Sequence, residues 1–355
     1  MNTSRNPEEP KESKSGSNQI IRSEKKRRSY RKLLPAALLA ALAVLAGLGL
    51  FSLLNSKTGN NEPVRIDLPA DDFSMLCNLL DRKDVKATST FHFAARLMKL
   101  DRNVRPGSYI VEPRMNTLAL VRKLRNGQQD PIRLTIGKFR LPDDLNRYLG
   151  EKLMHNDFDI PLDSFHLVLP DTYEVYWTIT PDAFMQRMAK ESEHFWSKQH
   201  TSQSEKNKDS RIRMDSDSSV RDLVILASIV EEETNYGPEK PLIASVYLNR
   251  LRRGMPLQAD PTVKYAVGDF TLRRILFEHL AMESPFNTYL HTGLPPAPIC
   301  LPSKATIRAV LDATETDYLY FCASEQLDGT HRFAATLAEH NRNAARYHAA
   351  ISKKQ

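Results

Sequence analysis

Three adjacent glutamates follow an apolar stretch of the sequence. The segment Val220–Glu233 predicts a helix that is nearly all apolar until it reaches Glu231, Glu232 and Glu233. Each of the three falls near an apolar position seven residues earlier, so the helical period does not choose which one faces inward. A carboxyl group at the end of a buried helix has a raised pKa and can donate a proton near neutral pH. The alternative is a solvated helix end. Negative charge at a helix C-terminus opposes the helix dipole, which favours a functional reason for the cluster.

Two later segments carry polar side chains. Gln258, Asp260 and Thr262 lie on a turn that contains a proline, and Asp-Pro-Thr commonly begins a helix, so a structural role is favoured for this segment taken alone. Asn287 and Tyr289 precede a proline-rich stretch, and amide, hydroxyl and aromatic groups on such a rigid loop suit sugar binding. Each segment taken alone also fits a structural turn or an ordinary surface loop.

Histidines and cysteines give no metal or cofactor signature. His331 and His340 invite a metal or acid/base interpretation, but they lack the His-x-x-x-His spacing, so a structural hydrogen-bonding role is favoured. The three cysteines, Cys77, Cys300 and Cys322, imply no disulfide framework. Free, buried thiols are favoured over a Cys300–Cys322 pair. Phosphate-loop and nucleophile-elbow motifs are absent from the sequence, so we expect neither a cofactor nor a metal.

The N-terminal region predicts a membrane anchor. Residues 33–54 form an uncharged run of 22, and a bilayer core needs about 20 apolar residues. Residues 1–32 hold ten Lys/Arg and four Glu, a net charge of +6, and read as a disordered cytoplasmic tail. The positive-inside rule then places the N-terminus in the cytoplasm and the rest of the chain outside it. A cleaved signal peptide and a buried soluble helix are the alternatives.

The charge balance argues against a nucleic-acid partner. The whole chain carries +7, so the residues after 32 contribute only about +1, from 40 basic and 39 acidic side chains. The high isoelectric point is therefore an effect of the tail. A nucleic-acid-binding domain would need a basic face on its folded part.

The elements that position these side chains predict an α+β fold in two modules. Residues 60–130 form a small module and residues 131–355 a larger domain, with 55–62 as a polar linker before the first strand. The expected strands are Val64–Leu68, Ser108–Val111, Ile132–Ile136 and a buried Tyr318–Ala323. The expected helices are Asp71–Leu80, Ser89–Leu100, Thr117–Leu124, Leu145–Leu153, Pro181–Lys198, Val220–Glu233, Pro241–Arg253 and Leu337–Ile351. We expect exposed loop at His200–Ser219 and irregular structure at Thr288–Ser303.

Taken together, the motifs resemble the MltG/YceG-like endolytic murein transglycosylases. The resemblance covers roughly residues 60–350, in matching order and spacing. It is carried by Ile229–Thr234, Val246–Leu251, Leu257–Thr262, Asn287–Tyr289, Gly293–Pro296 and His331-x-Phe333 with Glu339–Asn341. It extends upstream through Gly107–Tyr109 and Pro170–Tyr173.

The resemblance implies a membrane-anchored enzyme of the plasma (inner) membrane with a periplasmic catalytic domain. Such an enzyme cuts nascent peptidoglycan between N-acetylmuramic acid and N-acetylglucosamine, leaves 1,6-anhydro ends and so limits strand elongation. The first module is expected to be LysM-like, and peptidoglycan synthases are candidate partners. The family's catalytic glutamate stands directly before the motif threonine, which is Glu233 here. Gln258, Asp260, Thr262, Asn287 and Tyr289 are the candidate substrate-binding residues.

One carboxyl group suffices for this chemistry. Ordinary glycosidases use two carboxylates, whereas an attack by the muramic C6 hydroxyl on C1 of the same sugar needs no water-activating base. The competing hypotheses are a non-catalytic, membrane-anchored peptidoglycan-binding scaffold and a linker of the cell-wall machinery that acts through its tail. The sequence departs from the family pattern at Phe286, where tyrosine is common, and at Ala297 and Ser303, where glycines are common. Phe165-His166 stands where a Glu-Gly pair is common.

Overall fold

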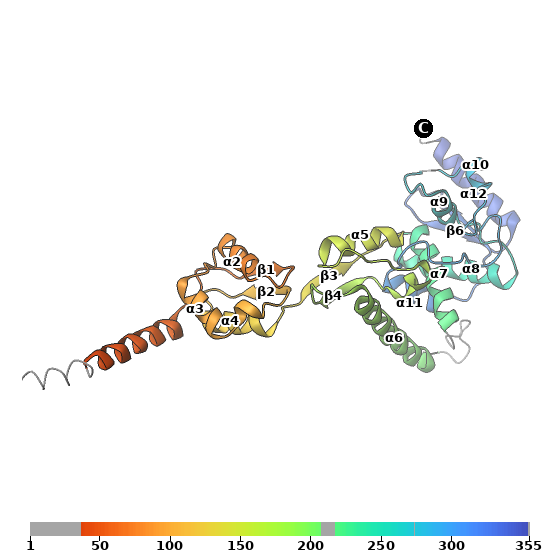
Figure 1. Ribbon diagram of the computed structural model, residues 1–355. Coiled ribbons are helices and arrows are strands. Elements are labelled where there is room, and N and C mark those ends of the chain that lie inside the picture. Colours follow the sequence, from red (N-terminus) through yellow and green to blue (C-terminus); the bar gives the residue numbers. More distant parts are fainter. Residues whose placement is uncertain (1–36, 207–216, 273, 354–355) are drawn as a thin grey trace, which may run out of the picture. The chain divides into compact units, whose positions relative to one another are not determined.

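The computed structural model describes residues 37–206, 217–272 and 274–353. The chain divides into two compact units, Met1–Gln129 and Asp130–Gln355, both mixed α+β (Figure 1). The predicted tail at residues 1–32 and the first four residues of the predicted membrane segment lie outside the described residues.

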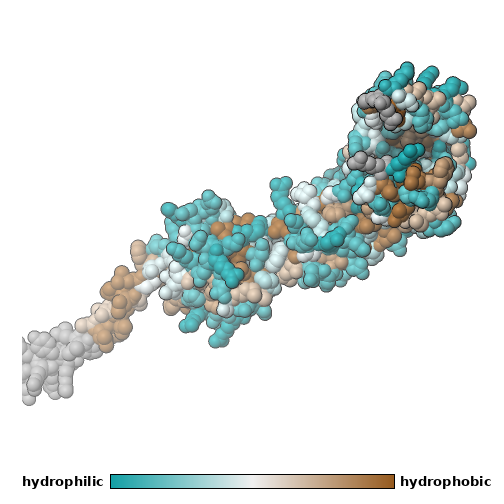
Figure 2. Space-filling model, turned by 90° about the horizontal axis from the view of Figure 1, so that it is seen from above, coloured by the Kyte–Doolittle hydropathy of each residue, from teal (hydrophilic) through white to brown (hydrophobic). Residues whose placement is uncertain are grey.

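An apolar helix spans Ala37–Asn55 and is long enough to cross a membrane. Its 19 residues correspond to about 28 Å at 1.5 Å per residue, close to the roughly 30 Å of a bilayer core. All its leucines except Leu53 are exposed, and the helix appears as an apolar stretch in Figure 2. A helix that is apolar all round and unburied suits a single-pass membrane anchor.

The end of this helix and the polar linker after it are packed onto the first module. Leu53 is only 5% exposed and belongs to the module's core. The Thr117 amide donates to the Ser56 carbonyl at 2.9 Å, and Thr58 donates to Met115 in the same way at 2.8 Å. The buried Asn60 side chain donates to Val111. Short polar residues here supply hydrogen bonds to the module instead of solvating a tether.

The first module is a two-stranded antiparallel sheet covered by three helices. Strands β1 (Val64–Leu68) and β2 (Gly107–Val111) pair with Val64 opposite Val111. The helices are α2 (Phe73–Arg82), α3 (Ser89–Leu97) and α4 (Thr117–Asn126), with a short 3₁₀ helix at Leu100–Arg102. Each helix starts at a side-chain cap, from Asp72, Thr88 and Asn116 respectively, which accepts from otherwise unpaired first-turn amides.

The second unit begins with another two-stranded sheet and its own core. Strand β3 (Ile132–Ile136) pairs antiparallel with β4 (Asp171–Val175), a strand that the sequence analysis did not identify. Helices α5 (Pro142–Lys152) and α6 (Pro181–Lys206) and the 3₁₀ helix η2 (Leu162–Leu167) complete this layer. Leu134, Leu149 and Phe184 are among its fully buried side chains.

Helix α7 (Asp217–Glu233) is the centre of the larger core. Every side chain from Leu223 to Val230 is buried, including Ser228. The helix packs against α8 (Lys240–Arg252), α9 (Asp260–Val267) and α11 (Lys304–Leu311). The Ser228 hydroxyl bonds the Ile225 carbonyl and accepts from the Ile299 amide, so the irregular 288–303 segment is fixed against this helix. A buried helix whose last turn carries carboxylates must place those carboxylates close to the core.

The remaining elements of the second unit follow α8 and α9 or lie between the elements named above. They are η3 (Gly237–Glu239), α10 (Phe277–Leu280), the antiparallel pair β5 (Tyr320–Ala323) and β6 (His331–Ala334), and α12 (Leu337–Ser352). The predicted irregular segment at 288–303 contains no helix or strand.

Three expectations need correction. The segment at His200–Ser219 is helical at both flanks, because α6 continues to Lys206 and α7 starts at Asp217, and residues 207–216 lie outside the described residues. A polar helix lacks the apolar period that would reveal it. The strand at 320–323 is half-buried rather than buried. All three cysteines are free thiols, but only Cys300 is buried.

Candidate active site

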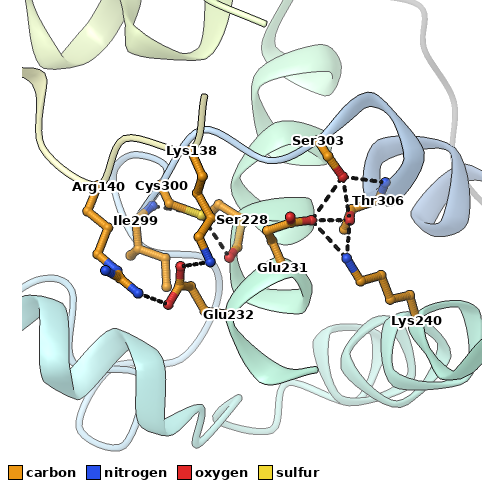
Figure 3. Close-up of polar contacts among 10 residues, drawn as sticks. All are labelled: Lys138, Arg140, Ser228, Glu231, Glu232, Lys240, Ile299, Cys300, Ser303 and Thr306. Atoms are coloured by element: carbon orange, nitrogen blue, oxygen red, sulfur yellow. Dashed lines mark hydrogen bonds and ion pairs between the residues drawn. The ribbon is translucent and has the colours of Figure 1, made fainter. Parts of the chain in front are cut away.

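Glu231 is an ionised structural residue. Its carboxylate accepts from Lys240 Nζ at 2.9 Å, from Ser303 Oγ at 3.1 Å and from the Thr306 hydroxyl (Figure 3). Burial raises its pKa, but the hydrogen bonds from Thr306 and Lys240 outweigh burial, and the net pKa is lowered. The group therefore joins α7 to α8 and α11 and has no proton to donate near neutral pH.

Glu232 is also ionised, and it lies on a different side of α7. Lys138 and Arg140, on the segment that follows β3, form ion pairs with its two oxygens at 2.9 Å each (Figure 3). Burial raises its pKa, but the hydrogen bonds and charges of these two cations lower the pKa by more. Arg140 lies over the Phe270 ring, with its guanidinium carbon 5.1 Å from the ring centroid.

Glu233, unlike Glu231 and Glu232, has no cationic partner within salt-bridge distance among the residues that the structure describes. Burial raises its pKa from 4.5 to about 7, with smaller raising effects from Asp260 and Glu232. The hydroxyl of Tyr247 on α8 donates to its Oε1 at 2.6 Å and lowers the pKa, as does the charge of Lys264 on α9. Tyr247 is itself only 1% exposed, so the hydrogen bond fixes the carboxyl group from the buried side.

A cavity of about 640 Å³ opens beside Glu233. Its polar lining includes Asn235, Tyr236, Thr330, His331 and Tyr347. The volume lies within the range of small-molecule sites, about 300–1,000 Å³. A carboxyl group with a pKa of about 7 at the wall of a polar cavity can donate a proton to a bound oxygen atom near neutral pH and take one back.

Asp260 and Tyr289 form a hydrogen-bonded pair whose charges act on Glu233. The Tyr289 hydroxyl donates to Asp260 Oδ1 at 2.6 Å. Burial raises the pKa of Tyr289, and the charges of Asp260 and Glu233 raise it further. The two predicted residues are therefore close enough to Glu233 for their charges to interact.

Gln258, two residues before Asp260, has an unusual backbone conformation. Its φ is +52°, in the left-handed region that residues other than glycine rarely adopt. Its backbone amide donates to the Thr288 carbonyl at 3.0 Å, and its side-chain Oε1 accepts from Arg250 at 3.2 Å. Strained residues of this kind cluster at functional sites.

Arg250 on α8 holds the turn at Leu257 and Gln258 by hydrogen bonds. The residue is 8% exposed, and its guanidinium donates to the carbonyls of Leu319 (2.7 Å) and Leu257 (2.8 Å). Burial lowers its pKa, and the guanidinium also stacks over the Tyr320 ring at 5.3 Å. The rigid, planar fork of its guanidinium lets one side chain join α8, the Gln258 turn and β5.

Thr262 and Asn287 are fully buried, and their polar atoms are bonded within the protein. The Thr262 hydroxyl donates to the Ala259 carbonyl at 2.7 Å and pairs with Thr288 Oγ1 at 2.8 Å. The Asn287 amide donates to the carbonyls of Leu280 and Met282. The structure gives both side chains a role in holding the loop, and their contact with a substrate stays a prediction.

His331 shares the cavity with Glu233. Its ring Nδ1 lies 2.7 Å from Glu239 Oε2, and its backbone amide donates to Glu239 Oε1 at 2.8 Å. The structural hydrogen bond expected for this histidine is present. The Glu239 partner was missed because it lies 92 positions away. Tyr247 was also missed, although it stands inside the Val246–Leu251 motif.

The departures from the family pattern have local explanations. Phe286 packs its ring 4.6 Å from that of Tyr265. Ser303 accepts from the Thr306 amide at the start of α11 and donates to Glu231. Ala297 is buried, and His166 Nδ1 pairs with the Asp163 carbonyl at 2.8 Å.

Comparisons with known proteins agree with these motifs. Residues 67–346 match the model of the YceG-like family. An endolytic murein transglycosylase of Bacillus subtilis (strain 168) is 44% identical over 129 residues, which are 36% of this chain and 35% of that protein. One from Streptococcus pneumoniae serotype 2 is 36% identical over 132 residues, or 36% of this chain and 24% of that protein. The aligned part thus spans about a third or less of these curated relatives.

A crystal structure of a putative yceG-like protein from Listeria monocytogenes is also similar. It is 26% identical in sequence, with a TM-score of 0.46, and the match covers 80% of this chain and 99% of that one.

Proposed function

Because the chain belongs to the YceG-like family, we propose that it is an endolytic murein transglycosylase with Glu233 as its catalytic acid. The observation that carries the proposal is the pKa of Glu233, raised by burial to about 7 beside a polar cavity. The neighbouring carboxyl groups of Glu231 and Glu232 are paired with cations and have lowered pKa values.

The first step is protonation of the bond that breaks. Glu233 donates its proton to the oxygen that links muramic C1 to N-acetylglucosamine, the C1–O bond breaks and the glucosamine leaves as an alcohol. A pKa of about 7 leaves roughly half of the group protonated at neutral pH, which suits a general acid.

The second step returns the proton. The ionised Glu233 takes the proton of the C6 hydroxyl while the C6 oxygen forms a bond to C1 of the same sugar. The product is a 1,6-anhydro end, and Glu233 is again protonated for the next cycle. The attack is intramolecular, so the reaction consumes no water. The Tyr247 hydrogen bond stabilises the carboxylate that exists between the two proton transfers.

Asp260, Tyr289 and Gln258 are the proposed substrate contacts, since all three are at least partly exposed. Asp260 and Tyr289 are close enough to Glu233 for their charges to interact, and the Gln258 backbone is bonded to the segment that carries Tyr289. Thr262 and Asn287 support that loop from inside it. Glycan strands of peptidoglycan are thus the substrate, and neither a metal nor a cofactor enters the proposed steps.

The chain is proposed to work outside the cytoplasm. The +6 charge of residues 1–32 precedes the apolar helix, so the N-terminus stays in the cytoplasm and residues 131–355 act as a periplasmic catalytic domain. Residues 60–130 would serve as a LysM-like glycan-binding module, and peptidoglycan synthases are the proposed partners.

The decisive experiment is digestion of purified peptidoglycan by the full chain in detergent, carried out in ¹⁸O-labelled water. Mass spectrometry should find 1,6-anhydro ends without ¹⁸O. Incorporation of ¹⁸O at C1 would instead mean hydrolysis. Glycan binding without any cleavage would favour the scaffold hypothesis.

A further inference from the structure

The His331–Glu239 pair is a buried-carboxylate and histidine arrangement that the proposed mechanism does not use. Both oxygens of Glu239 are engaged, one by the His331 amide at 2.8 Å and the other by the ring Nδ1 at 2.7 Å. The side chain of Glu239 is 10% exposed and that of His331 is 15% exposed. The Phe321 ring meets the imidazole edge to face, with centroids 5.5 Å apart and an interplanar angle of 88°. The imidazole is therefore fixed in position and in rotation.

The partner of Nδ1 determines the chemistry of Nε2. A carboxylate only accepts hydrogen bonds, so Nδ1 carries the hydrogen and Nε2 of the neutral ring is an acceptor. Nε2 has no hydrogen-bond partner among the described residues, and His331 lines the cavity that Glu233 also lines. A fixed acceptor at the wall of a cavity is suited to a ligand hydroxyl group, and not to a carbonyl oxygen.

The other lining groups point to the same class of ligand. Tyr236 is 50% exposed, and Tyr347, Asn235 and Thr330 add a second aromatic ring, an amide and a hydroxyl. Aromatic faces combined with neutral polar groups suit a pyranose ring, which has apolar C–H faces and hydroxyls at its edge.

We propose that His331 is a substrate-contacting residue, whose Nε2 accepts a hydrogen bond from a hydroxyl group of the hexosamine unit in this cavity. Glu239 is then a positioning residue, because it acts through the imidazole. The inference rests on the proposed function, since it takes the occupant of the cavity to be a sugar of the glycan strand.

Two substitutions separate the contact from the structural hydrogen bond. His331→Asn puts its amide NH₂ near the position of Nδ1, so it can keep the bond to Glu239 while it removes the atom at Nε2. His331→Gln puts its amide near Nε2 and loses the bond to Glu239. Arg332→Gln is the control, because Arg332 is the next residue on β6, has an exposed side chain that pairs with Glu325 and does not line the cavity.

The measurement uses the full chain in detergent and glycan strands freed of peptides. In a Glu233→Gln background, His331→Asn should weaken strand binding by about 3- to 10-fold, the range for one hydrogen bond. In the active chain it should raise KM by a similar factor with a smaller change in kcat. His331→Gln should recover part of the binding, and Arg332→Gln should bind like the parent. The melting temperature of His331→Asn should match that of the control.

Three results would overturn the inference. If His331→Asn binds strands as tightly as the parent, only the structural role of His331 remains. The same conclusion holds if both His331 variants lose binding and also have a lower melting temperature. A parent that does not bind strands at all would refute the sugar site. Products that carry ¹⁸O would refute the proposed lytic reaction and leave the His331 contact standing, because binding is measured without cleavage.

Discussion

Replacement of Glu233 by glutamine should abolish cleavage and stabilise the protein at the same time. Glutamine is nearly isosteric with glutamate, and its amide oxygen can still accept the Tyr247 hydrogen bond. It has no proton to transfer. General acid/base catalysis contributes about 10²–10⁴-fold for each role, and Glu233 is proposed to fill two.

The gain in stability follows from the pKa. A carboxyl group with a pKa of 4.5 when unfolded and about 7 when folded is harder to ionise in the folded state. At 1.36 kcal/mol per pH unit, the difference of about 2.5 corresponds to roughly 3 kcal/mol. The stability from this group is present below pH 4.5 and is lost as the pH rises to about 7. Glu233→Gln should therefore have the same melting temperature as the wild type at pH 4.5 and a higher one at pH 8.

Glu231→Gln and Glu232→Gln are matched controls, and both should lower the stability that Glu233→Gln raises. Glu231→Gln leaves Lys240, whose side chain is 13% exposed, without its counter-charge, which should destabilise by about 1–3 kcal/mol. Glu232→Gln should lose only about 1 kcal/mol, since Lys138 and Arg140 are more exposed. Both variants should keep cleaving glycan strands in proportion to the fraction that is folded.

The assay combines anhydro-muropeptide release with thermal unfolding of the three variants at pH 4.5 and 8. For a unit of this size, 3 kcal/mol corresponds to roughly 6–12 °C in melting temperature. An active Glu233→Gln beside an inactive Glu231→Gln or Glu232→Gln would refute the assignment. A Glu233→Gln chain that melts below the wild type at pH 8 would refute the electrostatic argument.

Three further outcomes are expected. Tyr247→Phe removes a hydrogen bond that lowers the pKa of Glu233, so the alkaline limb of the pH–activity profile should move to higher pH; a limb that stays in place would contradict this coupling. Deletion of residues 1–57 should give a soluble chain that is about 2 kcal/mol less stable to urea in its first module than deletion of residues 1–52, because only the shorter deletion keeps Leu53 in the core and the Ser56 bond; equal midpoints would mean that this packing adds nothing. A reporter fused after Gln355 should be active only if it works outside the cytoplasm, and a signal from a cytoplasm-only reporter would reverse the orientation and remove access to polymerised glycan.

The sequence by itself determined the features that depend on local chemistry. The uncharged run before Leu54 indicates a membrane-crossing length without any knowledge of packing. Alternating apolar residues identified Val64–Leu68 and Ile132–Ile136 with the observed bounds. The motif around Glu233 identified the family, because the order of several short segments is specific even where each one alone is not.

Only the tertiary structure determined the features that depend on contacts between distant parts of the chain. Periodicity placed all three glutamates of α7 on equal terms, and they differ because Lys240, Lys138 and Arg140 reach two of them from distant segments and leave Glu233 beside Tyr247 and the cavity. The Glu239–His331 pair and the packing of Leu53 were hidden for the same reason. A pKa depends on which charges lie within a few ångströms and how much water has been excluded, and a chain that has not yet folded fixes neither.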